Sequence, residues 1–165
     1  MSDATAMTAE QKEAFHREAE AKIRTFSYQK PADAKDRDGH PMVKQIANVV
    51  RGDLVRLNVQ IVKEGGENNL HYHTGGDTVW MVLKGAARFY GVGDKLLGEV
   101  GPNGGILLPG GSRYWFEKVG SEDLEILQIV CKESRQAQTA RINLDQHKDW
   151  MNEERLQVYD KAAAK

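Results

Sequence analysis

Apolar and polar residues alternate along the centre of the chain, from about Pro41 to Lys132. The clearest case is segment 54–61, where every second residue is apolar. A period of two is that of a β-strand with one buried face. Similar short runs, rich in Val, Ile and Leu and bounded by glycine turns, recur along the segment. The pattern predicts an all-β core with strands at 54–61, 70–73, 78–83, 86–90, 105–108, 114–118 and 124–131.

The two ends of the chain follow a different pattern. Residues 8–24 open with Thr8, a good helix N-cap, and place apolar side chains at helical spacing, among them Phe15 and Ile23. This predicts a helix whose apolar stripe docks on the core or on a partner subunit. Residues 147–165 return to helix formers and predict a second helix. We therefore divide the chain into an N-terminal helical arm and loop (1–41), a β-core (42–133) and a C-terminal helical arm (134–165).

Length, charge and cysteine content limit the possible functions. A chain of 165 residues suits one domain, and 23 basic against 24 acidic residues argue against partners such as nucleic acid or an anionic membrane. No apolar stretch approaches the roughly 20 residues of a spanning helix. The first residues lack the features of a secretory signal, and the single cysteine, Cys131, excludes an internal disulfide. These observations predict a cytoplasmic protein whose partner is a small molecule.

His71 and His73 are the residues most suggestive of chemistry. Residues two apart on a strand project from the same face, about 7 Å from one another, so both imidazoles can converge on one point. Neutral imidazole is a good ligand for a divalent transition metal, whether iron, manganese, zinc, nickel or copper. The alternative is a buried, hydrogen-bonded pair in a metal-free pocket.

The sequence around these histidines resembles the first motif of the cupin superfamily. That motif runs glycine, five residues, His-x-His, three or four residues, glutamate, six residues and glycine. Gly65, His71, His73 and Gly85 match it. The second cupin motif has a Pro-x-Gly-x-x-His centre, and the segment 109–114, Pro-Gly-Gly-Ser-Arg-Tyr, is similar to it.

The resemblance implies a cupin-type double-stranded β-helix, a jelly-roll barrel, with a mononuclear metal inside. This sequence departs from the motifs at two positions, because Thr78 stands in place of the glutamate and Tyr114 in place of the later histidine. Asp77 can supply a third ligand only if the following strand shifts by one residue, and otherwise it stabilises the turn. Tyr114 could bind a ferric ion, hydrogen-bond a substrate or act as an acid.

Strand alternation suggests the walls of the pocket. Trp80 and Thr78 share one face, and Phe116 shares another with Tyr114. Such an aromatic wall would accept an aromatic compound or a short organic acid. Arg56, with Asn58 and Gln60, forms a polar stripe that either lines this pocket or faces solvent.

Two functions follow from these residues. The first is a metal-dependent cupin enzyme, an oxygenase or an isomerase/lyase, in which His71 and His73 hold the ion and Tyr114 positions the substrate or relays a proton. The second is a non-catalytic cupin that binds a small metabolite through the same pocket. The N-terminal arm and the resemblance also predict a homodimer.

Overall fold

The structure is a computed structural model that describes residues 7–144 and the backbone of 158–160. It is built almost entirely of β-strands, with one helix and a short 3₁₀ turn, η2 (Val92–Asp94), among the described residues. The elements are α1 (Ala9–Glu20), β1 (Lys44–Arg51), β2 (Val55–Val62), β3 (His71–His73), β4 (Gly76–Lys84), β5 (Ala86–Tyr90), β6 (Leu96–Val100), β7 (Gly105–Leu108), β8 (Trp115–Val119), β9 (Leu124–Lys132), β10 (Arg141–Asn143) and β11 (Val158–Asp160).

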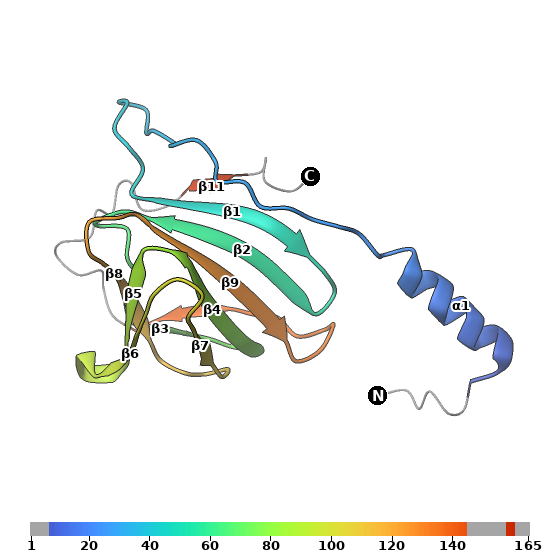
Figure 1. The fold of residues 1–165 in the computed structure, drawn as a ribbon. Helices are drawn as coiled ribbons and strands as arrows, with labels where there is room; N and C mark the ends of the chain where they lie inside the picture. Colours follow the sequence, from blue (N-terminus) through green and yellow to red (C-terminus); the bar gives the residue numbers. More distant parts are fainter. Residues whose placement is uncertain (1–6, 145–157, 161–165) are drawn as a thin grey trace.

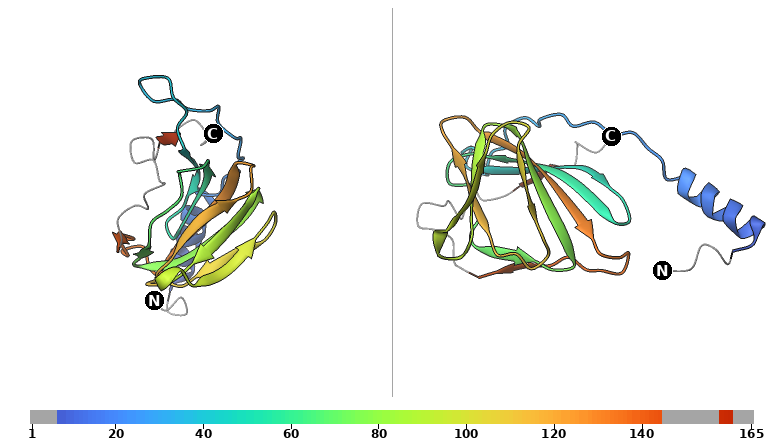
Figure 2. Two further views of the ribbon diagram at one scale, coloured as in Figure 1. Left: turned by 90° about the vertical axis from the view of Figure 1, so that its left-hand side faces the viewer. Right: turned by 60° about the horizontal axis from the view of Figure 1, so that its bottom comes forward.

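The strands form two layers around a shared interior (Figures 1 and 2). The larger layer is a six-stranded sheet with the order β11-β1-β2-β9-β4-β7. The smaller layer consists of the sheets β6-β5-β8 and β10-β3. A single bridge between His71 and Tyr114 connects β3 to the start of β8, so this layer is nearly continuous. The result is the all-β architecture that the hydrophobic pattern predicts.

The interior changes character along its length. At one end, inward side chains such as Val82, Phe89, Phe116 and Ile126 form a fully buried apolar core. Two residues further along β9, the same face presents Gln128. The inner face of the neighbouring strand β2 changes in the same way. Val62 lies at its apolar end, and the other inward side chains of the strand are polar. A polar half of the interior therefore adjoins the apolar core.

The seven predicted strands are all present, with ends shifted by at most two residues. The pattern does not predict four further strands, β1, β6, β10 and β11. The pattern does not predict β1 because the strand begins with Lys44 and Gln45, which are buried although such residues usually lie on the surface. β6 lacks alternation and resembles part of a glycine turn.

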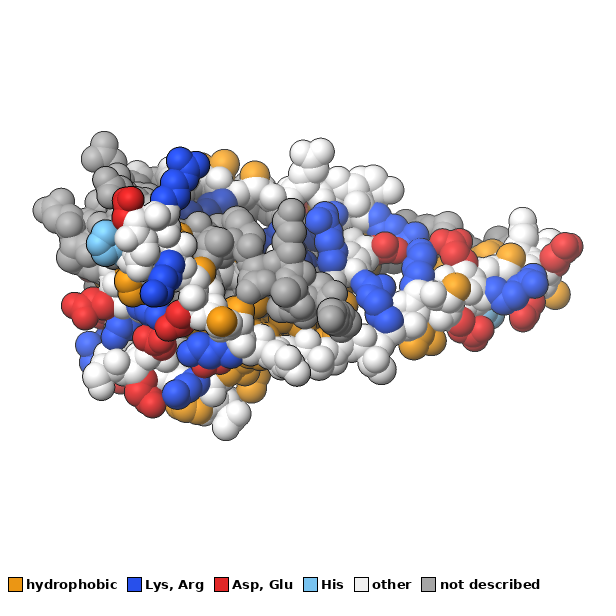
Figure 3. Space-filling model, turned by 90° about the horizontal axis from the view of Figure 1, so that it is seen from above, with side chains coloured by type: hydrophobic (Ala, Val, Ile, Leu, Met, Phe, Trp, Pro, Cys, Tyr) orange, Lys and Arg blue, Asp and Glu red, His pale blue; other side chains and the backbone are white. Residues whose placement is uncertain are grey.

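The N-terminal helix is present and begins with a capping box. The Thr8 side chain accepts a hydrogen bond from the Gln11 backbone N–H, and the Gln11 side chain accepts one from the Thr8 backbone. No residue of α1 is buried, and the helix projects away from the sheets with hydrophobic and charged side chains mixed along it (Figure 3). The expected docking of its apolar stripe on the chain's own core is therefore not found. The homodimer stays a prediction.

The prediction of a C-terminal helix is wrong for those residues of the C-terminal arm that the structure describes. Residues 158–160 form β11, which pairs in parallel with β1, and residues 141–143 form β10, which pairs with β3. An open sheet edge offers hydrogen bonds to these segments, and this pairing outweighs local helix propensity. The rest of the predicted helix lies outside the described residues. Among the described residues, no helix is both long and apolar enough to cross a membrane.

Gly76 at the start of β4 tests the close packing of strands beside the pocket. Its φ is +152°, and a Cβ there would lie 1.8 Å from the main-chain oxygen of Cys131. We expect Gly76→Ala to lower the free energy of unfolding by about 2–4 kcal/mol. Gly98→Ala, where a Cβ meets nothing within 4 Å, is the matched control. Equal urea midpoints for the two variants would contradict the packing described here.

Candidate functional site

The polar half of the interior contains a pocket of about 230 Å³. It lies between the inner face of the large sheet and the β3–β10 pair. A second, outer cavity of about 540 Å³ shares Arg56 and Thr139 with it, so the two spaces adjoin. The pocket is lined by Lys44, Ile46, Arg56, Asn58, Gln60, Asn68, His71, His73, Trp80, Gln128, Thr139 and Arg141.

His71 and His73 lie side by side in β3, with ring centroids 5.0 Å apart and ring planes nearly perpendicular. His71 is almost completely buried, and its Nδ1 lies 2.7 Å from the main-chain oxygen of Asn69. A carbonyl oxygen can only accept, so Nδ1 of His71 carries the hydrogen. In the neutral ring, Nε2 of His71 is therefore an acceptor.

Pairing between β3 and β10 brings Arg141 to the histidines. The register sets Arg141 opposite His73, so both side chains emerge on the same face. Arg141 Nη2 donates to the side-chain oxygen of Asn69, whose main-chain oxygen holds His71. Asn69 thus orients both a histidine and an arginine of the pocket.

Both imidazoles are neutral at physiological pH. Burial lowers the pKa of His71 to about 3, and the charge of Arg141 lowers it further than the Asn69 hydrogen bond raises it. Burial also lowers the pKa of His73 to about 4, with further effects from Arg141 and Arg56. The positive charges of Arg141 and Arg56 therefore oppose protonation of either histidine.

Lys44 brings a further amino group into the pocket from β1. It is buried, and its Nζ donates to the side-chain oxygen of Asn68. Burial lowers the pKa of Lys44 to about 7, Arg141 lowers it further, and Glu67 opposes the shift. Lys44 therefore titrates near neutral pH.

The polar stripe of β2 lies inside the pocket. Arg56, Asn58 and Gln60 all belong to its lining, and Asn58 Nδ2 donates to Gln128 Oε1 across 3.1 Å. Arg56 Nε, Asn58 Oδ1 and Gln60 Oε1 are buried without a hydrogen-bond partner. The sequence left the orientation of this stripe open, and the pairing of β2 with β9 decides it.

The other predicted pocket residues divide into two groups. Trp80 lines the pocket, and its Nε1 donates to the Tyr114 hydroxyl across 3.1 Å. Thr78 and Tyr114 border a small space that shares His73 with the pocket. The ring centroids of Tyr114 and His71 are 4.5 Å apart. Phe116 packs in the apolar core, to which Trp80 and Tyr114 also belong.

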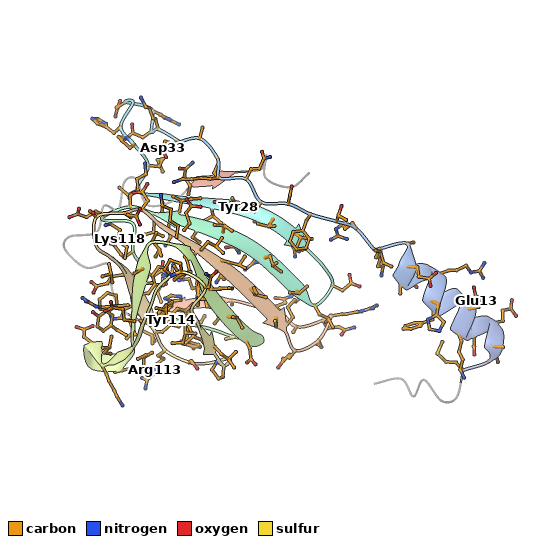
Figure 4. All side chains as sticks on the ribbon, in the orientation of Figure 1. Glu13, Tyr28, Asp33, Arg113, Tyr114 and Lys118 are labelled. Atoms are coloured by element: carbon orange, nitrogen blue, oxygen red, sulfur yellow. The ribbon has the colours of Figure 1, made fainter. Side chains whose placement is uncertain are left out.

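Tyr114 is buried between the layers, whereas its neighbour Arg113 is exposed at their edge (Figure 4). Burial raises the pKa of the Tyr114 phenol well above its usual value, so this group stays protonated. Its hydroxyl is not part of the pocket lining, and its predicted role as a catalytic group stays a prediction.

Asp77 lies apart from the histidine pair. It is exposed on the face of β4 opposite to Thr78 and Trp80, and its Oδ1 accepts a hydrogen bond of 2.9 Å from the Gly110 backbone N–H. No one-residue shift turns it inward, because β4 pairs with β9 in regular register from Gly76 to Val82. Asp77 thus holds the backbone of the turn at Gly110, rather than its own Gly-Gly-Asp-Thr segment, and its assignment as a metal ligand stays a prediction.

The donor set around the histidines does not fit a resident metal ion. The described lining offers two neutral imidazoles but no carboxylate, and Lys44, Arg56 and Arg141 face the same space. Such cations oppose a divalent ion. A possible metal-binding triad exists elsewhere, in the loop before β1, where ligand atoms of Asp36, Asp38 and His40 lie within 4.8 Å of one another. There Asp36 Oδ1 accepts hydrogen bonds from the backbone of Asp38 and His40, as in an ordinary turn.

Several lining residues escape prediction from sequence. Lys44 and Arg141 stand in segments without a recognised pattern, and only strand pairing brings them inward. Gln128 carries a usable signal, because it interrupts the apolar series Leu124, Ile126 and Val130 on one face of β9.

Comparison with known proteins supports the fold. No family model and no curated protein matches the chain. A protein with a double-stranded β-helix domain from Klebsiella pneumoniae aligns with 74% of this chain and 100% of its own, at 17% identity and a TM-score of 0.55. An RmlC-like cupin protein from Desulfovibrio desulfuricans aligns with 66% of this chain and 96% of its own, at 17% identity and a TM-score of 0.52.

Two larger proteins match over a shorter region. Vicilin from tomato and oxalate decarboxylase from Bacillus subtilis, an enzyme with Mn(II) centres, each align with 55% of this chain at 21% and 18% identity. The chain spans only about a quarter of their lengths, 25% and 24%, with TM-scores of 0.47 and 0.45.

The chain thus has the cupin fold. The strand order, the two-layered interior and the similar solved structures agree with the motifs that run from Gly65 to Gly85 and from Pro109 to Tyr114. Within this fold the particular chain carries a histidine pair surrounded by cations.

The lowered pKa values of the histidines predict a loss of stability in acid. The unfolded chain takes up protons at His73 below about pH 6.5, but the folded chain does so only near pH 4. The free energy of unfolding should therefore fall as the pH falls through this interval. His73→Asn removes this titrating group. The loss of free energy of unfolding between pH 7 and pH 4 should therefore be smaller in the variant by about 1–2 kcal/mol, allowing for partial exposure. Urea unfolding at pH 7 and pH 4 measures it.

The exposed His16 in α1 provides the control. His16→Asn should leave the difference in stability between pH 7 and pH 4 unchanged. A His73→Asn protein with the same acid dependence as the wild type would show that His73 is not held neutral by its surroundings.

Proposed function

We propose that this chain binds a small organic anion in the pocket between β2 and the β3–β10 pair. The observation that carries the proposal is the charge of the lining. Lys44, Arg56 and Arg141 contribute cationic groups, and the lining contains no acidic side chain among the residues that the structure describes.

Electrostatics favours an anionic ligand in such a place. A cation removed from water is costly unless it is paired, and no carboxylate in the described lining pairs with Arg56. A ligand carboxylate would supply the pairing, and the planar guanidinium of arginine matches a carboxylate with two parallel hydrogen bonds. The neutral histidines border the same space, and Nε2 of His71, being an acceptor, pairs with a donor group of the ligand and not with its carboxylate.

The size and the walls of the pocket agree with a small organic molecule. Its volume of about 230 Å³ lies below the roughly 300–1,000 Å³ of pockets for drug-sized ligands. Trp80 and Ile46 add apolar surface for a carbon skeleton. The indole N–H of Trp80 already donates to Tyr114, so it is not available to the ligand.

This proposal favours the non-catalytic metabolite-binding protein over the metal-dependent oxygenase or isomerase/lyase. The deciding consideration is the donor set, because Thr78, Tyr114 and Asp77 do not add a ligand to His71 and His73 in the pocket lining. The charges of Arg56 and Arg141 favour a carboxylate at the same place. The anion occupies the position that the motif resemblance assigns to a metal.

Anion affinity should depend on pH through Lys44. Its amino group is protonated below about pH 7 and loses its proton as the pH rises, so carboxylate affinity should be highest below pH 7 and fall between pH 7 and pH 9. Lys44→Met should weaken binding about tenfold at pH 6.5 and remove this dependence. Calorimetric titration with mono- and dicarboxylates of two to six carbons measures both effects.

Arg88 offers a matched control for the arginine of the pocket. Arg88 pairs with Glu99 on an exposed sheet, so Arg88→Gln should leave affinity unchanged, whereas Arg56→Gln should weaken it. The proposal would be overturned if none of these acids bound, or if both arginine variants bound them as well as the wild type.

Metal content is the second test. Elemental analysis of protein purified without chelator should find no stoichiometric transition metal held by the histidine pair. His71→Ala with His73→Ala should therefore leave the metal content unchanged, and Asp36→Asn reports separately on the exposed loop triad. An ion present at one per chain and lost with the two histidines would instead establish the metal-dependent enzyme as the better hypothesis.

A further inference from the structure

Three unpaired polar atoms lie along the inner face of β2. Arg56 Nε is a donor without an acceptor, while Asn58 Oδ1 and Gln60 Oε1 are acceptors without a donor. The side chains of Asn58 and Gln60 are nearly fully buried, at 4% and 7% exposed. All three residues line the pocket. The three atoms are themselves buried, within residues that form one wall of the pocket, and Glu67 Oε2 is a fourth buried atom without a partner in the described part of the chain.

The spacing of these atoms follows from the strand. Residues two apart on one face are separated by about 7 Å, so the stripe presents the cation first and the two amides beyond it. The Asn58 amide is held in place by its hydrogen bond to Gln128 across 3.1 Å, which leaves Oδ1 for another partner. The stripe is an ordered series of groups, with a charge at one end and acceptors along its length.

Buried polar atoms are almost always hydrogen-bonded, and an unpaired one is costly. A simple carboxylate supplies the acceptor for Arg56 but no hydrogen for Asn58 or Gln60. A neutral polyol supplies hydrogens but leaves the charge of Arg56 uncompensated. A carboxylic acid that also carries hydroxyl groups supplies both.

We propose that the ligand class is a hydroxylated carboxylic acid, of the hydroxy-acid or sugar-acid type, whose carboxylate pairs with Arg56 and whose hydroxyls donate to Asn58 and Gln60. This inference rests on the proposed anion-binding function and narrows it. The ring of Trp80 covers the C–H groups of the carbon chain, as the flat aromatic wall of a polar small-molecule site does.

Calorimetry with the full chain tests the hydroxyl contribution directly. Gluconate, hexanoate and sorbitol share a six-carbon chain and differ in the carboxylate and the hydroxyls, and tartrate and succinate form a second, dicarboxylate pair. We expect gluconate or tartrate to bind at least tenfold more tightly than its deoxy counterpart, and sorbitol to bind more weakly than either hydroxylated acid.

Substitutions assign the hydroxyl contacts. Gln60→Leu and Asn58→Leu should each reduce the ratio of affinity for the hydroxylated acid to affinity for the deoxy acid about tenfold. Gln29→Leu, on the exposed N-terminal segment, is the control and should leave this ratio unchanged. Retained binding of the deoxy acid shows that each variant is folded, and the ligand pairs on the unaltered protein decide the question if a variant does not fold.

The outcomes separate this inference from the proposal on which it rests. Equal affinity of hydroxylated and deoxy acids overturns the ligand class but keeps the anion-binding function. Binding of sorbitol as tight as gluconate overturns both, as does failure of every acid to bind. An unchanged hydroxyl preference in both amide variants overturns the assignment to Asn58 and Gln60.

Discussion

Positive charge inside a β-sheet interior is the constraint on which the rest of this structure depends. Lys44 is buried, Arg56 is half-buried, and Arg141 is exposed on β10 but lines the same space. A buried charge such as that of Lys44 weakens the fold unless something compensates it. The chain compensates for these charges by neutral amides around them, by the carboxylate of Glu67 near Lys44 and by keeping both histidines unprotonated.

The apolar core makes this arrangement tolerable. Phe89, Phe116 and Ile126 pack with other apolar side chains at one end of the interior, so hydrophobic burial is concentrated there. The polar end can then hold charged and amide side chains without loss of the fold. Asn69 holds two residues of the pocket in place. Its main-chain oxygen accepts from the ring of His71, and its side-chain oxygen accepts from the guanidinium of Arg141. A pocket held in this way is preorganised, which lowers the cost of binding.

In this cupin fold, two of the four positions that the motifs assign to metal ligands hold other residues. His71 and His73 keep the place that the first motif gives them. The residues that would accompany them in a metal centre are replaced by Thr78, which is buried outside the pocket, and Tyr114, whose hydroxyl accepts from Trp80. Strand β10 adds Arg141, which makes the surroundings of the pair positive. The fold thus leaves the chemistry open.

Local periodicity in the sequence determined much of this protein by itself. The alternation in 54–61 and in the other six runs predicts strands that are present, Thr8 predicts the start of α1, and the His-x-His spacing predicts two imidazoles on one face. Each of these features depends on a few neighbouring residues. Tertiary structure alone decided that Lys44 and Arg141 join the histidines, that Asp77 faces away, and that residues 158–160 form a strand rather than a helix. These depend on which strands pair and in which register, and that is a property of the whole sheet rather than of any local stretch of sequence.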